Sequence, residues 1–147
     1  MQRRLLLPVL IAPVLLAGVV ACDTIGSDDA PTPPATGSYE TQTLTVQTDT
    51  GSVNALARGT FIEMRLQPDN TVTDGVLMIS PGFTEEDVDG SRRVEFAGTW
   101  SQTSDSTVTF DHEADTFIRD TDWHFANDTL RTNNGEVNAV LRKQEDS

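Results

Sequence analysis

The fold class is decided by residues 92–102, RRVEFAGTWSQ. Every second position of this stretch can face a core, namely Val94, Phe96, Gly98 and Trp100, and most of the intervening side chains are polar. Side chains of a β-strand point alternately to opposite faces, so this period of two predicts a strand with one buried face. Ser104-Asp105 predicts a turn, after which Thr107–Asp111 returns as a second strand with Val108 and Phe110 inward. The stretch therefore predicts an antiparallel hairpin.

Short alternating runs continue on both sides of this hairpin, from Tyr39 to Lys143. Thr is abundant in them, and Gly, Asn and Asp separate them, which favours strands joined by turns over helices. Asn133-Asn134-Gly135 is typical of a hairpin turn. The predicted strands are Tyr39–Thr48, Thr60–Gln67, Thr71–Ser80, Arg92–Gln102, Thr107–Asp111, Asp115–Arg119 with Trp123–Ala126 (two short strands or one bent strand), a strand around Leu130, and Glu136–Lys143.

These runs predict an all-β domain with about eight strands. Consecutive short strands favour an antiparallel up-and-down barrel, and a β-sandwich is the alternative. Closure of the sheet leaves no unpaired strand edge, which favours the barrel. An eight-stranded barrel has an interior that side chains can just fill, or that can hold one small ligand.

The N-terminus has the parts of a secretory signal peptide. Arg3-Arg4 precedes an apolar stretch from Leu5 to Val20, and small residues follow up to Cys22. A retained transmembrane helix needs ~20 apolar residues. The stretch here is slightly shorter and contains Pro8 and Pro13, which disfavour an uninterrupted helix. We therefore expect residues 1–21 to be a signal peptide that is removed.

The run Val19-Val20-Ala21-Cys22 resembles the lipobox of bacterial lipoproteins. In that family diacylglycerol, with palmitate-type chains, is attached to the Cys thiol and the peptide bond before it is cleaved. The resemblance implies a lipid anchor at Cys22 and a location in the cell envelope, facing the periplasm or the cell exterior. Inner and outer membrane both remain open, and a secretory signal without lipidation is the alternative. Cys22 is the only cysteine, so we expect no internal disulfide.

Composition divides the remainder into a tether and a folded domain. Residues 22–37 contain Pro31, Pro33 and Pro34 with several Asp and small residues, which predicts a flexible linker. Residues 38–147 form the predicted barrel domain. The chain has a net charge of −13, and loss of Arg3 and Arg4 makes the remainder two units more negative. Phosphate backbones are bound through Lys and Arg, so we expect no nucleic-acid partner. Anionic bilayers repel such a domain, so we expect membrane attachment through the lipid alone.

Two short patterns resemble the calycins, and in particular small bacterial lipoproteins with a lipocalin-like barrel. Gly37-Ser38-Tyr39 opens the first strand and Leu141-Arg142 ends the last, similar to the calycin pairing of a Gly-x-aromatic start with a basic residue of the final strand. Gly98-Thr99-Trp100, followed by Thr107-Val108-Thr109-Phe110, carries the second similarity. The resemblance implies a barrel closed at one end by a cation–π contact between Tyr39 and Arg142, with two unrelated edge residues as the alternative. Under the first interpretation, replacing Arg142 lowers stability.

Aromatic residues gather in the second half of the domain: Phe96, Trp100, Phe110, Trp123 and Phe125. They would form the wall of a pocket for a small apolar ligand, or they would simply fill the core. Two function classes follow. One is an exported lipid-anchored lipocalin-like protein that binds a small apolar ligand, and the other is a structural or protein-interaction lipoprotein with a packed barrel and an acidic outer surface. The protein partner of the second class is not specified by the sequence.

Metal binding and catalysis have little support in the sequence. Asp111-His112-Glu113, Asp115, Asp120, Asp122 and His124 combine residues that can bind zinc, but alternation sends His112 to the face opposite Asp111 and Glu113. We therefore expect a solvated surface rather than a metal site there. No nucleophile elbow and no glycine-rich phosphate loop is present in the sequence. We expect no enzymatic activity and no cofactor.

Overall fold

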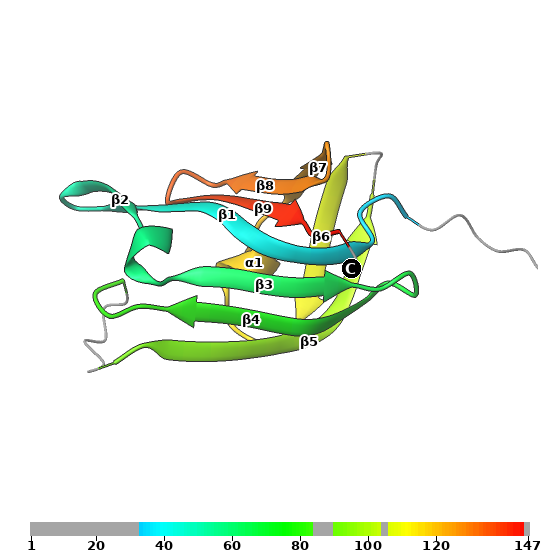
Figure 1. Cartoon of the computed structure of the whole chain (residues 1–147), viewed down its shortest axis with the longest axis horizontal. Coiled ribbons are helices and arrows are strands. Elements are labelled where there is room, and N and C mark those ends of the chain that lie inside the picture. The colour runs from blue at the N-terminus through cyan, green and yellow to red at the C-terminus, as the bar shows by residue number, and fades with distance from the viewer. Residues whose placement is uncertain (1–32, 84–89, 104–105, 146–147) are drawn as a thin grey trace, which may run out of the picture.

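The structure, a computed structural model, describes residues 33–83, 90–103 and 106–145. The predicted signal peptide, Cys22 and most of the tether lie outside these residues. The strands are β1 (Gly37–Thr48), β2 (Gly51–Asn54), β3 (Phe61–Leu66), β4 (Thr71–Ile79), β5 (Arg92–Gln102), β6 (Thr107–His112), β7 (Trp123–Ala126), β8 (Thr129–Asn133) and β9 (Val137–Lys143). Neighbouring strands pair antiparallel, and β1 also pairs with β9, which closes the sheet (Figure 1). The predicted all-β barrel is confirmed: eight strands close it, and β2 is an extra strand.

β1 is the strand that joins the two ends of the sheet. Its first residues, Gly37–Glu40, pair with β3, and its last residues, Thr45–Thr48, pair with β2 on the same edge. Its other edge pairs with β9 from Tyr39 to Val46. Neither β2 nor the short 3-10 helix η1 (Leu56–Arg58) was predicted from the sequence. They have four and three residues, too few for a periodic pattern of apolar side chains to be recognised.

The inward faces follow the predicted alternation. Ile62, Met64 and Leu66 of β3 are buried, with exposed Glu63 and Arg65 between them. Phe96 and Trp100 of β5 are buried in the same way. These side chains belong to one continuous apolar cluster, to which each of the eight barrel strands contributes inward-facing residues. The barrel therefore has a core of side chains.

Residues 115–119 form no strand, so the predicted strand there is wrong. A single-turn helix, α1 (Phe117–Asp120), stands in its place. The ion pair from the Arg119 guanidinium to Asp115, four residues away, measures 3.0 Å, and Thr121 Oγ1 donates to the carbonyl of Phe117 at 2.8 Å. Both contacts favour a turn over an extended chain. Ile118 is the one buried side chain of that turn, and a single apolar residue between polar ones had suggested the alternation of a strand.

The barrel wall is incomplete on one side of β5. β6 ends at His112, which pairs with Gly98 in the middle of β5. Along Arg92–Ala97, the edge of β5 that faces away from β4 therefore has no neighbouring strand among the described residues. β6 pairs with β7 at only two positions, Thr107 with His124 and Val108 with Trp123. Residues 113–122, here called the strap, connect β6 to β7 and include α1, which packs against β6. A helical segment thus takes the place of paired strands in this part of the wall.

The described chain begins and ends at the same end of the barrel (Figure 1). The Gln144 backbone N–H donates to the carbonyl of Ser38 at 2.8 Å, which holds the two ends together. The β1–β2 hairpin and η1 lie at the opposite end. Any attachment through residues preceding Pro33 therefore leaves η1 on the far side of the domain.

Candidate functional site

The aromatic residues predicted from the sequence lie together inside the barrel. Phe96, Trp100, Phe110 and Trp123 are between 1% and 5% exposed, and Phe125 is half-buried. The Phe110 and Trp123 rings meet edge to face, with centroids 6.1 Å apart. Trp123 also stacks on Phe117 of α1 at 6.4 Å. The predicted set is therefore one cluster, and the strap contributes an additional ring to it.

Each tryptophan donates its indole N–H to a backbone carbonyl within the protein. Trp123 Nε1 donates to the carbonyl of Ile118 at 3.2 Å, and Trp100 Nε1 donates to that of Gln67 at 3.1 Å. Ile118 is fully buried in the apolar cluster. The polar atoms that could orient a ligand in the predicted pocket are thus engaged in contacts that hold the barrel together.

Two cavities of the described residues lie on the outer surface. One of about 570 Å³ crosses β3, β4 and β5 and is lined by Glu63, Asp74, Gly75, Val76, Arg93, Glu95, Phe96 and Ala97. Another of about 730 Å³ is lined by the C-terminal residues from Arg142 to Glu145 together with Asp128. Neither is lined by Trp100, Phe110 or Trp123. The arrangement offers open surface outside the barrel and a filled interior.

The outer surface of β1, β3 and β5 carries a row of glutamates. Glu40 lies directly opposite Glu63, and Val76 of β4 stands between Glu63 and Glu95 in the paired register. Arg93 forms an ion pair with Glu95 at 3.0 Å, and both side chains are largely exposed. Arg142 lies opposite Glu40 in the pairing with β9, and Arg65 of β3 is also exposed. Acidic and basic side chains are therefore both present on this face.

His112 is a buried polar residue that the sequence analysis considered only as a metal ligand. It is 6% exposed, and its ring packs on Phe96 with centroids 4.8 Å apart. Its Nε2 lies 3.5 Å from Thr116 Oγ1, whereas its Nδ1 is buried without a hydrogen-bond partner among the described residues. Burial lowers the pKa of His112, and the nearby Arg119 charge adds to this lowering. The Ala114 backbone and the charges of Asp111 and Asp120 oppose it. Burial has the larger effect, so the surroundings of the ring favour its neutral form.

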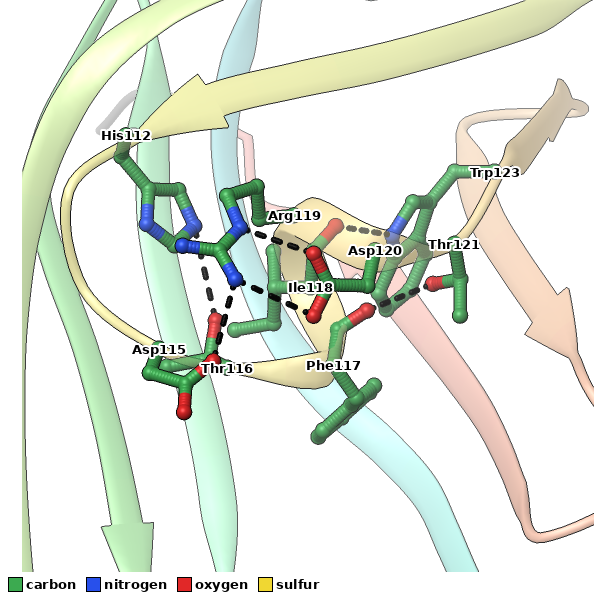
Figure 2. A network of polar contacts seen from close by, with 9 residues as sticks. All are labelled: His112, Asp115, Thr116, Phe117, Ile118, Arg119, Asp120, Thr121 and Trp123. Atoms are coloured by element: carbon green, nitrogen blue, oxygen red, sulfur yellow. Dashed lines mark hydrogen bonds and ion pairs between the residues drawn. The ribbon is translucent and has the colours of Figure 1, made fainter.

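Polar contacts bind the strap to itself and to the barrel (Figure 2). The Arg119 guanidinium bridges Asp115 and Asp120, at 3.0 and 2.8 Å. The hydrogen bond from Arg119 lowers the pKa of the Asp120 carboxyl. Thr132 Oγ1 of β8 donates to the carbonyl of Asp122 at 2.9 Å. The carboxylates of Asp115 and Asp120 thus both form ion pairs with Arg119.

The structure separates Tyr39 from Arg142. Tyr39 is 1% exposed and donates its hydroxyl to the carbonyl of Ala35 at 2.7 Å, whereas Arg142 is exposed on the outer face opposite Glu40. Burial raises the pKa of the Tyr39 phenol, and the charge of Asp128 adds to this. Lys143, one position further on, is the residue paired with Tyr39, and its stem covers Gly37. Successive side chains of a strand point to opposite faces, so the exposed Arg142 side chain lies on the face away from the buried Tyr39 ring.

We expect Tyr39→Phe to lower the free energy of unfolding by roughly 1–2 kcal/mol, because the buried Ala35 carbonyl loses the hydrogen bond from the phenol. Arg142→Ala should change it by less than about 0.5 kcal/mol, since the side chain is exposed. Urea unfolding of both variants checks this pair. A larger loss of stability in Arg142→Ala than in Tyr39→Phe would instead support a cation–π contact between these two residues.

Within the described ranges, the structure brings together no group of three or more His, Cys, Asp or Glu side chains that could hold a metal ion. His112 is buried and His124 is exposed, so the two histidines do not converge. None of the helices in this part of the chain is long and apolar enough to cross a bilayer.

The comparisons with protein-family models, with curated proteins and with solved structures give no match for this chain. The lipocalin-like interpretation therefore depends on the barrel itself and on the short patterns in the sequence.

Proposed function

We propose that this protein is a lipid-anchored, non-enzymatic protein of the cell envelope that works through the outer surface of a packed lipocalin-like barrel. The filled interior is the observation that carries this proposal. Ile118, Trp123 and their neighbours occupy the volume that a ligand would need. The outer face across β1, β3 and β5 carries both glutamates and arginines, is open to solvent and offers a charged surface for a protein partner.

A small apolar ligand inside the barrel is less well supported. A ligand there would have to displace Ile118 or one of the aromatic rings that now contact each other. Their mutual packing stabilises the fold through burial of apolar surface, and a ligand would have to replace that contribution. The cavities that remain open are polar and lie outside the barrel.

Native mass spectrometry distinguishes these two functions. The protein is purified from its own cells, the tether is cut, and the mass of the released domain is measured under conditions that preserve complexes. We expect the bare mass of the domain. A reproducible stoichiometric addition of a small molecule would overturn the packed-barrel proposal in favour of ligand transport.

The anchor is tested separately with Cys22→Ser in the full chain. We expect the parent protein to fractionate with membranes and to carry diacylglycerol on its N-terminal Cys, and the variant to lose both properties. The reason is that a serine hydroxyl cannot replace the thiol in thioether formation. Mass spectrometry of the N-terminal peptide and membrane fractionation give the result. Equal membrane retention of both proteins would contradict a lipid anchor at this residue.

A further inference from the structure

We propose that the strap, residues 113–122, is a pH-sensitive closure of the barrel wall that is tight at neutral pH and loosens on acidification, with His112 as the group that binds the proton. This device is independent of the lipid anchor and of any partner. It follows from three features of the described residues: a gap in the strand pairing, a helix that covers it, and a buried imidazole beneath the helix whose Nδ1 has no hydrogen-bond partner there.

The wall is weakest where the strap covers it. β6 and β7 share two paired positions, whereas β5 pairs with β4 at seven positions and β8 with β9 at five. The strap is held by the contacts of a single segment. They include burial of Ile118 and Thr116, stacking of Phe117 on Trp123, and the hydrogen bonds from Trp123 and Thr132. Local opening requires loss of the few contacts in one segment rather than of the whole sheet, and such segments open first.

His112 connects protonation to this segment. Its ring lies between Phe96 of β5 and Thr116 of the strap, and its buried Nδ1 has no hydrogen-bond partner among the described residues. A second proton on the ring would be buried away from water, and the Ala114 backbone offsets this cost only in part, so the charged form is disfavoured. Opening of the strap exposes the ring to water, where the imidazolium is hydrated.

The charges around His112 offset one another, so burial decides which form of the ring the closed state favours. From the strap, Arg119 opposes the charged form and Asp120 favours it, while Asp115 and Asp120 both bind the Arg119 guanidinium. From its own strand, Asp111 favours the charged form from the exposed face, and from β5 the neighbours are Phe96 and Gly98, which carry no charge. The closed state thus favours the neutral ring over the charged one.

The direction of the pH dependence follows from this difference. The open state binds a proton with the ordinary affinity of histidine, with a pKa of about 6.5, and the closed state binds it more weakly. Closure is therefore fully favoured above that value and is progressively lost as the pH falls below it. At pH values below the pKa of the closed state the loss levels off.

The two tryptophans provide an internal comparison for the experiment. The Trp123 indole N–H donates to the strap at Ile118, and the Trp100 indole N–H donates to Gln67, outside the strap. Hydrogen exchange of both indole N–H groups is measured by NMR on the ¹⁵N-labelled full chain in mild detergent. The ratio of the two exchange rates removes the intrinsic effect of pH on exchange.

We expect the Trp123 to Trp100 rate ratio to rise roughly three- to tenfold between pH 7.5 and 5.5. His112→Phe keeps a buried ring and should abolish the rise. His124→Gln removes the other histidine, which is exposed on β7, and should preserve it. A constant ratio in the parent protein, or a rise that persists in His112→Phe, overturns the proposal.

A direct titration covers the case in which His112→Phe does not fold. The chemical shifts of both imidazole rings are followed in the parent protein over the same pH range. The midpoint of the change in exchange ratio should coincide with the titration of His112. Coincidence with His124 alone would show that the strap responds to another group and would refute the proposal.

Discussion

Gly98→Ala is expected to cost about 3 kcal/mol or more of the free energy of unfolding, a large share of the stability of a domain of this size. β5 and β6 approach each other so closely here that a Cβ atom at Gly98 would lie 2.1 Å from the carbonyl oxygen of Asp111 and 2.9 Å from the Cβ atom of His112. Neither atom belongs to the far end of a flexible side chain, so the strands themselves would have to separate. Urea unfolding followed by circular dichroism measures the loss.

Gly82→Ala is the matched control for this substitution. Gly82 has a φ of 87°, and no atom of the described residues lies within 4 Å of an added Cβ, so the alanine meets conformational strain but no clash with this part of the chain. Such strain is worth roughly 1–2 kcal/mol. We expect Gly98→Ala to be clearly the more damaging of the two. Equal losses would mean that β5 and β6 lie further apart than the structure has them.

Trp123→Ala is expected to destabilise the protein by about 3–5 kcal/mol, the range for removal of a large aromatic side chain from a core. Trp123 is 1% exposed and contacts the rings of both Phe110 and Phe117. Its loss would leave a cavity where the strap meets the barrel and would remove the hydrogen bond to Ile118. Thermal and urea unfolding give the magnitude.

Trp123→Phe separates packing from hydrogen bonding. The smaller ring keeps most of the apolar contact but leaves the buried Ile118 carbonyl without its donor, which costs about 1–3 kcal/mol. We therefore expect this variant to lie between the parent protein and Trp123→Ala. A loss as large as that of the alanine variant would assign the role of Trp123 to the hydrogen bond rather than to the ring.

The barrel could be predicted from the sequence because several of its strands have a clear period of two. In β3 and in the middle of β5 the inward positions are apolar or Gly and their neighbours are mostly polar or small. Burial of one face fixes the register of such strands. The hairpin turn at Asn133-Asn134-Gly135 could also be predicted, because the conformation of a turn depends on the local properties of Asn and Gly. Gly135 has a φ of 90°, and Asn134 Oδ1 accepts from the backbone of Val137 at 2.7 Å.

The strap could not be predicted, because its conformation depends on contacts distant in sequence. Ile118 is buried by the barrel, and the turn around it is fixed by Trp123 and Thr132. A stretch with one apolar residue between polar ones fits a short strand as well as a helical turn. The role of His112 was hidden for the same reason: alternation predicted its face but not that β6 would end there beneath a helix.

The two-sided pairing of β1 has a mechanical consequence. The chain enters the domain at the start of β1, and that strand is hydrogen-bonded to β3 and β2 along one edge and to β9 along the other. A pull exerted on the N-terminus, with resistance at the far end of the barrel, acts along the axis of β1 and loads these bonds in shear, all at once. The hydrogen bonds of β1 therefore resist extraction of the strand together. A force across the β6–β7 seam would instead separate its two paired positions one after the other. A domain that is held by its N-terminus is thus held by its most firmly bonded strand.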